Sequence, residues 1–173
     1  MLMDIEKLYR EYFAPVYRYA FSLVHDPDLA EEITQETFFR ALRKIDDYRG
    51  EASLKVWLCQ IAKNLCFDSA KRQTKMIPLM IKGEDDAASC YDIPADRESN
   101  PEEQLLRKQT AMKIHRILHD LKEPYKEVFQ LRTFGDLSYS EIGELFEKSE
   151  SWARVTYYRS RMMIKEELDE DSL

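Results

Sequence analysis

The chain has 173 residues, of which 44% are hydrophobic and 34% charged, so it can form one medium-sized domain or two small ones and is not a collagen-like or low-complexity protein. It contains no apolar run near the roughly 18 residues that a membrane span needs, and the mixed charges at its amino end are unlike those of a signal peptide. Three cysteines are too few, and odd in number, for a disulfide framework, which favours a reducing cytoplasm.

The first part of the chain is predicted to form a small helical domain. Its apolar side chains recur every three or four residues, as on one face of a helix. Asp26 and Pro27 have the residue types of an N-cap and a first helical position, and Gly50 marks a loop before the third helix. The three expected helices span residues 4–24, 27–45 and 53–73.

Helical periodicity is lost between residues 74 and 100. This stretch contains prolines, a glycine and the acidic run Glu84-Asp85-Asp86, and it is longer than ordinary connections within a domain. We therefore expect an acidic linker between two separate domains, with boundaries 1–73, 74–100 and 101–173.

The second domain is expected to contain a helix-turn-helix. A helix over 101–121 is followed by another that starts at Pro124. Ser138 and Glu141 have capping-box spacing at the start of a short helix, and after a break at Glu147 the last helix is capped by Ser149 or Ser151 and reaches Leu168. No strand pattern appears, so the predicted fold class is all-α, with two small helical domains.

Two short basic segments interrupt a chain whose net charge is −7. Residues 53–75 and residues 148–165 each carry five basic side chains and one acidic side chain. A phosphate backbone responds to such local patches rather than to the total charge. On the last helix, Arg154 and Arg159 lie off the apolar stripe, where they can contact bases or phosphates of DNA. An ordinary solvated helix face is the alternative.

The third helix and the loop before it could bind single-stranded or melted nucleic acid. Basic side chains and aromatic rings together suit phosphates and unstacked bases. Tyr48 lies in a polar loop and is the exposed candidate ring, whereas the periodicity favours a core position for Trp57.

The sequence contains no residue pattern typical of an enzyme active site. His115 and His119 are four residues apart but lack companion ligands, so we interpret them as a helix-surface pair rather than a metal site. Cys59 and Cys66 read as small packing residues. No pair of carboxylates can be assigned as a general acid and a general base. The sequence therefore predicts no catalytic residue, no metal and no cofactor.

Four stretches resemble motifs of one protein family, in that family's order. They are residues 25–42, which contain Gln35-Glu36-Thr37-Phe38, residues 48–64, which begin Tyr48-Arg49-Gly50-Glu51-Ala52-Ser53, and residues 121–132 and 137–143. The family is that of the extracytoplasmic-function sigma factors, which direct RNA polymerase to promoters, often in stress responses. The resemblance covers both predicted domains.

The resemblance implies that the chain is an alternative sigma factor and not an enzyme. Its partners would be core RNA polymerase (the β′ clamp helices and the β subunit), promoter DNA and an anti-sigma factor, with no small-molecule substrate. The residues that match the polymerase-binding helix are Glu32, Gln35, Glu36 and Arg40. Those that match the −10 DNA-binding segment are Tyr48, Arg49, Gly50, Glu51, Ala52, Ser53, Lys63 and Asn64. Those that match the −35 recognition helix are Arg154, Val155, Tyr158 and Arg159.

The chain departs from the family pattern around the last helix. Glu147 stands at a tight turn that is usually glycine, and Trp152 and Thr156 replace a smaller and a basic residue. We therefore expect an unusual −35 preference. The alternative function is a free-standing helix-turn-helix regulator, which would have no need for the Tyr48 loop.

Overall fold

This computed structural model describes residues 5–76 and 100–170 of the chain. Those residues contain seven α-helices, one short 3₁₀-helix and no strand, which confirms the all-α fold class. The helices are α1 (Ile5–Val24), α2 (Pro27–Arg43), η1 (Ile45–Asp47), α3 (Leu54–Met76), α4 (Pro101–Asp120), α5 (Tyr125–Thr133), α6 (Tyr139–Leu145) and α7 (Glu150–Glu170). None of the described helices is long and apolar enough to cross a lipid bilayer.

The helix ends follow the capping residues in the sequence. The side chain of Asp26 accepts a hydrogen bond from the backbone N–H of Leu29 at 3.0 Å. Ser138 and Glu141 form the expected capping box of α6. Of the two serines proposed for α7, Ser149 accepts a hydrogen bond from the N–H of Trp152 at 3.1 Å. Helix α3 extends to Met76, slightly past its predicted end, and most of the expected linker lies outside the described residues.

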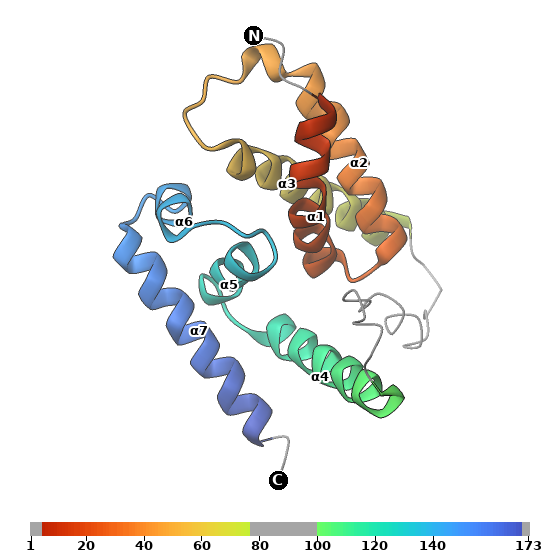
Figure 1. Cartoon of the computed structure of the whole chain (residues 1–173), viewed down its shortest axis with the longest axis vertical. Coiled ribbons are helices and arrows are strands. Elements are labelled where there is room, and N and C mark those ends of the chain that lie inside the picture. Colours follow the sequence, from red (N-terminus) through yellow and green to blue (C-terminus); the bar gives the residue numbers. More distant parts are fainter. Residues whose placement is uncertain (1–4, 77–99, 171–173) are drawn as a thin grey trace.

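Helices α1, α2 and α3 form the first bundle around a continuous apolar core. Its fully buried members include Val16, Ala30 and Leu58, and Trp57 packs against it from the edge, as the periodicity predicts. Burial of such side chains is the main stabilising contribution in a bundle of this size. Figure 1 shows these helices together in the upper part of the molecule.

Helices α4 to α7 form the second unit. Leu118 of α4, Phe129 of α5 and Ile164 of α7 make a small core that joins the long helices α4 and α7. Helices α6 and α7 are the predicted helix-turn-helix, with α5 packed behind them. Gly143 in α6 allows the turn to pass closely, since a Cβ there would lie 2.9 Å from the carbonyl oxygen of Lys148.

The two units share a core instead of standing apart. Tyr19 of α1 and Cys59 of α3 are buried against side chains of the second unit, namely Val128, Leu131, Leu137, Ile142 and Ala153. The side-chain amide of Gln130 is almost fully buried and donates a hydrogen bond to the carbonyl oxygen of Ser22 at 2.9 Å. The sequence predicted two separate domains, and their direct packing in this structure was not anticipated (Figure 1).

We predict that Glu147→Gly stabilises the protein. Glu147 has a φ of 54°, in the left-handed region, which typically costs a non-glycine residue about 1–2 kcal/mol. Glycine removes this strain but loses more backbone entropy on folding, so the expected net gain is about 0.5–1 kcal/mol in the free energy of unfolding. Urea denaturation measures the change. Glu144→Gly, within α6, should lower stability by about 1 kcal/mol, and a stabilising effect of both changes would contradict the strain argument.

Candidate functional site

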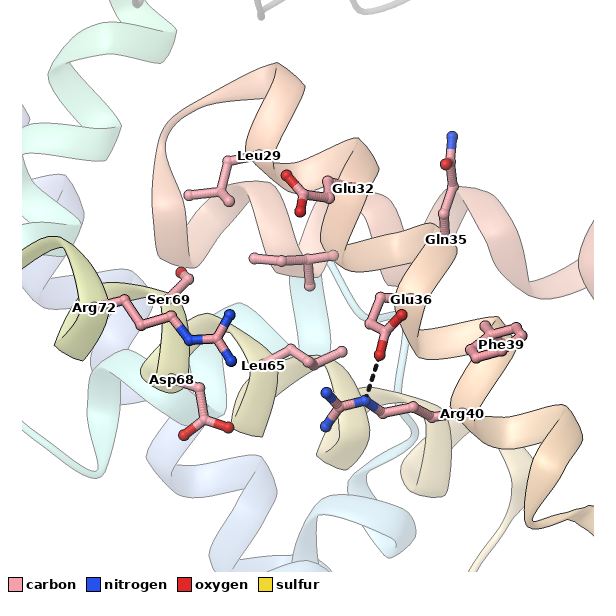
Figure 2. Close-up of a pocket in the computed structure, with 11 residues that line it drawn as sticks. Leu29, Glu32, Gln35, Glu36, Phe39, Arg40, Leu65, Asp68, Ser69 and Arg72 are labelled. Carbon is pink, nitrogen blue, oxygen red and sulfur yellow. Dashed lines mark hydrogen bonds and ion pairs between the residues drawn. The ribbon is translucent and has the colours of Figure 1, made fainter.

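A groove of about 470 Å³ lies between α2 and α3. It is lined by all four residues predicted to bind the polymerase, Glu32, Gln35, Glu36 and Arg40, and on the α3 side by Leu65, Asp68, Ser69 and Arg72. The guanidinium of Arg40 pairs with Glu36 at 2.7 Å between Nε and Oε1 (Figure 2). The groove therefore presents a mixed-charge border around an apolar floor.

Phe39 is an exposed aromatic ring at this groove, and sequence reasoning missed it. Its side chain is 55% exposed, whereas the neighbouring Phe38 is buried in the bundle core. Consecutive helical residues point about 100° apart, so one of the pair has to leave the core. The signal was present in the sequence as two adjacent phenylalanines in a helix that has one apolar face. The guanidinium of Arg43 lies over the Phe39 ring, 5.6 Å from its centroid.

The loop between η1 and α3 carries six of the eight predicted −10 residues, and the other two, Lys63 and Asn64, lie on α3. The hydroxyl of Tyr48 donates a hydrogen bond to the carbonyl oxygen of Ala52, and its ring stacks on Trp57 with centroids 4.9 Å apart. Tyr48 is thus half-buried, not the freely exposed ring that the sequence suggested. Arg49, Gly50 and Glu51 are exposed, and Gly50 has a φ of 73°, which glycine adopts without strain.

Two of the predicted −10 residues contact the second unit. The hydroxyl of Ser53 donates a hydrogen bond to Glu141 of α6, and the ammonium of Lys63 pairs with Glu127 of α5. Burial would raise the pKa of Glu141, but the hydrogen bonds from Ser53 and Ser138 outweigh it, so the pKa lies below its usual range. Asn64 remains exposed.

Helix α7 presents the four predicted −35 residues on its solvent face. Val155 and Tyr158 are 48% and 63% exposed, whereas Ala153, Thr156 and Ser160 are buried. Arg154 and Arg159 are exposed on either side of the Val155–Tyr158 strip, as their helical spacing requires. Trp152 is half-buried and packs against Phe146, with ring centroids 5.3 Å apart.

Arg132 and Tyr139 are further candidates for a nucleic-acid contact, and the sequence analysis did not single them out. The guanidinium groups of Arg132 and Arg154 both lie over the Tyr139 ring, at 4.8 and 5.5 Å from its centroid. Arg132 also donates a hydrogen bond to the carbonyl oxygen of Leu137 at 2.8 Å. Two cations that share one ring form a compact basic cluster next to the outer face of α7. Arg132 and Arg154 lie on different helices, α5 and α7, so their spacing in the sequence does not predict that they meet.

His115 is not the surface residue that the sequence suggested. It packs between the two units, with its ring 5.1 Å from His25 and 5.9 Å from both Phe21 and Phe134. His119, one helical turn later, is exposed and contacts Asp120. The interpretation of the two histidines as a surface pair is therefore wrong for His115, because tertiary packing covers that side of α4.

Burial lowers the pKa of His115 to about 4, with a further contribution from the charge of His25. The pKa of His25 is also lowered, first by burial and then by the charges of Lys126 and His119. A neutral His115 is thus favoured in the folded state. Its contribution to stability is complete above the ordinary value of 6.5 and is lost as the pH falls from there towards 4.

We predict that His115→Phe flattens the acid dependence of stability. Between pH 7 and pH 4.5 the wild type should lose about 2 kcal/mol more of its free energy of unfolding than this variant, whose ring can keep the contacts with Phe21 and Phe134. Urea denaturation over this pH range measures the difference. His119→Gln removes an exposed histidine and should leave the wild-type slope in place. Equal slopes in wild type and His115→Phe would show that His115 protonates freely in the folded protein.

The described part of the chain contains no cluster of metal-binding side chains, and its cysteines are buried. Among residues 5–76 and 100–170, no group of three or more His, Cys, Asp or Glu side chains could hold a metal ion. Cys59 and Cys66 are both buried, as predicted for packing residues, and burial raises the pKa of each thiol to about 12. Both therefore remain protonated, poor nucleophiles in this structure.

Family models match both units of the chain. Residues 8–76 match sigma-70 region 2, and residues 111–164 match sigma-70 region 4. The RNA polymerase sigma factor YlaC of Bacillus subtilis (strain 168) is 31% identical over 166 residues, covering 95% of this chain and 92% of the relative. The ECF RNA polymerase sigma factor SigM of the same organism is 28% identical and covers 94% of each chain.

Two solved structures share the fold. The sigma factor RpoE in complex with the anti-sigma factor NepR from Bartonella quintana superposes with a TM-score of 0.67 at 19% identity, covering 96% of this chain and 97% of that one. CnrH in complex with the cytosolic domain of CnrY gives a TM-score of 0.62 at 18% identity. With the region models and the relatives in agreement over nearly the whole length, the chain belongs to the RNA polymerase sigma factors of the extracytoplasmic-function group.

Proposed function

We propose that this sigma factor directs core RNA polymerase to its promoters through three separate surfaces. The groove between α2 and α3 binds the polymerase, the loop from Tyr48 to Ser53 with Lys63 and Asn64 captures the melted −10 strand, and the outer face of α7 reads the −35 element. The observation that carries the proposal is the groove, because every residue predicted for polymerase binding lines it. The corresponding domains are residues 1–73 and 101–173, joined by the acidic linker.

The groove has the features of a protein-docking site. Exposed Phe39 supplies an aromatic anchor, and the Glu36–Arg40 pair and Arg72 border it with charges of both signs. Aromatic and arginine side chains at the centre of an interface commonly provide most of the binding energy, while charged rims select the partner. The clamp helices of the β′ subunit are the proposed occupant.

The loop before α3 supports capture of an unstacked base. The stacked Tyr48 and Trp57 rings make a rigid aromatic wall, beside which Arg49 and Gly50 are exposed. A base extruded from the duplex can stack on such rings while its phosphates meet basic side chains. A free-standing regulator that binds duplex DNA has no use for this arrangement.

The face of α7 supports duplex recognition at −35. Val155 and Tyr158 offer apolar contacts in the major groove, and Arg154 and Arg159 flank them with guanidinium groups for bases or phosphates. Arg132, held over Tyr139 next to Arg154, adds a cation on the side of α6. These contacts are non-covalent, so we propose no catalytic role for any residue.

We further propose that the protein works in the cytoplasm and is controlled by an anti-sigma factor. RpoE, which shares this fold, was solved in complex with the anti-sigma factor NepR, and that pairing supports the proposal.

Reconstitution with core polymerase tests the function directly. The purified chain should co-elute with core enzyme in gel filtration, and the resulting holoenzyme should initiate at a subset of promoters that core enzyme alone ignores. A chain that leaves core enzyme unbound but binds duplex operators by itself would instead be a free-standing regulator.

We predict that Tyr48→Ala lowers open-complex formation by about tenfold. Stacking of a base on an aromatic ring is typically worth about 1–3 kcal/mol, and loss of the Tyr48 ring also removes the support of Trp57. Permanganate reactivity of promoter thymines measures strand opening. Tyr48→Phe keeps the ring but loses the hydrogen bond to Ala52, so it should retain most of the activity. An equal defect in both variants would show that the hydroxyl holds the loop and that stacking is unimportant.

A further inference from the structure

Three acidic side chains of the second unit contact α3 and the residue before it, and two of the three contact residues proposed to bind the −10 strand. Glu141 accepts a hydrogen bond from the hydroxyl of Ser53, and Glu127 pairs with the ammonium of Lys63. The third is Asp136, whose carbonyl and carboxylate oxygens accept hydrogen bonds from the ammonium of Lys55 at 3.0 and 3.3 Å. All three partners lie on α3 or directly before it.

These contacts resemble those that a nucleic acid backbone makes. Hydroxyl and ammonium groups are common donors to phosphate oxygens, and here each donates to an acidic residue instead. Glu127, Asp136 and Glu141 come from α5, from the α5–α6 loop and from α6, so the helix-turn-helix unit as a whole presents them to α3. The shared core beneath them, which includes Cys59, Val128 and Leu131, holds the two surfaces in register.

We propose that Glu127, Asp136 and Glu141 form an acidic latch that covers the −10 binding surface of the free protein. In this latched state the second unit occupies Ser53, Lys55 and Lys63, so that a melted strand and the second unit compete for the same side chains. The occupant is a segment of this chain, and the charge complementarity of the three contacts identifies it. The assignment of the covered surface to the −10 strand rests on the proposed function, whereas the latch itself does not.

The polymerase groove remains open while the latch is closed. The residues that line the groove on α2 and α3 make none of the described contacts to Glu127, Asp136 or Glu141. Polymerase can therefore dock on the first bundle before the second unit moves away. The latch would then delay DNA binding until the chain is part of the holoenzyme.

Neutral variants of the three acids test the latch by removing its negative charges. The triple variant Glu127→Gln, Asp136→Asn, Glu141→Gln keeps side chains of nearly the same size. Glutamine serves in a capping box as glutamate does, and asparagine tolerates the positive φ of 57° at position 136. The matched control changes three exposed acids of the second unit that make no described contact with α3, Glu103→Gln, Glu144→Gln and Glu166→Gln.

The thiol of Cys59 reports the opening of the latch. It is 2% exposed in the core shared by the two units, and a Cβ on Gly135 would lie only 3.5 Å from its sulfur. Cys66 packs in the core of the first bundle and serves as an internal reference. Labelling with 5,5′-dithiobis(2-nitrobenzoic acid), followed by peptide mass spectrometry, gives the rate at each cysteine.

We expect the triple variant to label at Cys59 at least about tenfold faster than the wild type, because three ion-assisted contacts are weakened together. Labelling at Cys66 should stay slow, the control variant should behave as the wild type, and the radius of gyration from X-ray scattering should increase only in the triple variant. The triple variant should also bind core polymerase about tenfold more tightly, since less free energy is then spent on opening.

Three results would overturn the latch. They are an unchanged rate at Cys59, an equal acceleration by the control variant, or an equal acceleration at Cys59 and Cys66, which would indicate unfolding instead of opening. A failure of the proposed function is distinct from these. A wild-type chain that does not bind polymerase, but whose triple variant opens as described, would leave the latch standing.

Discussion

Phe39→Ala should weaken the binding of this sigma factor to core RNA polymerase by about 30-fold or more. Phe39 is the large apolar side chain that α2 exposes at the polymerase groove, 55% accessible in the free protein. Truncation of an aromatic anchor in an interface commonly costs 2 kcal/mol or more, about 30-fold in the dissociation constant. Fluorescence anisotropy of a labelled chain titrated with core enzyme measures the affinity.

Phe67→Ala is the matched control for this prediction. Phe67 lies on α3, is 52% exposed and does not line the polymerase groove. It should bind core enzyme as the wild type does, and circular dichroism should report unchanged helicity for both variants. Equal losses in the two variants, or normal binding by Phe39→Ala, would place the docking surface elsewhere on the molecule.

Arg154→Ala and Arg159→Ala should impair −35 recognition in different ways. The amino-terminal part of a recognition helix approaches base edges, while later turns lie nearer the backbone. Arg154 lies in the second turn of α7. Its truncation to alanine should cost about 1–3 kcal/mol of DNA-binding free energy and relax the preference at one base position. Its guanidinium is already oriented by Glu150, at 2.6 Å, and by the Tyr139 ring.

Arg159→Ala should instead weaken binding to all promoters alike and lower the slope of log affinity against log salt concentration by about one. A panel of −35 base substitutions, transcribed by holoenzyme carrying each variant, separates the two effects. Uniform losses with Arg154→Ala and base-selective losses with Arg159→Ala would mean that α7 enters the groove in a different register, with Arg154 and Arg132 acting together on phosphates.

Local signals in the sequence were sufficient to predict the helices and the solvent-facing side of α7. Capping residues act on the backbone within three positions, so Asp26 and Ser138 mark helix starts without reference to the rest of the fold. The stripe of α7 that faces its own unit leaves the side of Val155 and Tyr158 to solvent. A repeat of 3.6 residues is enough to predict both features.

The sequence by itself thus determined the all-α class, the helix boundaries to within a few residues, the family resemblance and the outward face of α7. Only the tertiary structure decided what α3 does with its second face. One side, with Leu58 and Leu65, packs in the first bundle, while Val56 and Cys59 on the other pack against the second unit. A helix covered on two sides has no single apolar stripe, so its periodicity does not reveal the second partner. Burial of His115 and the contacts of Glu127, Asp136 and Glu141 likewise depend on residues far away in the chain, which helical spacing cannot relate to one another.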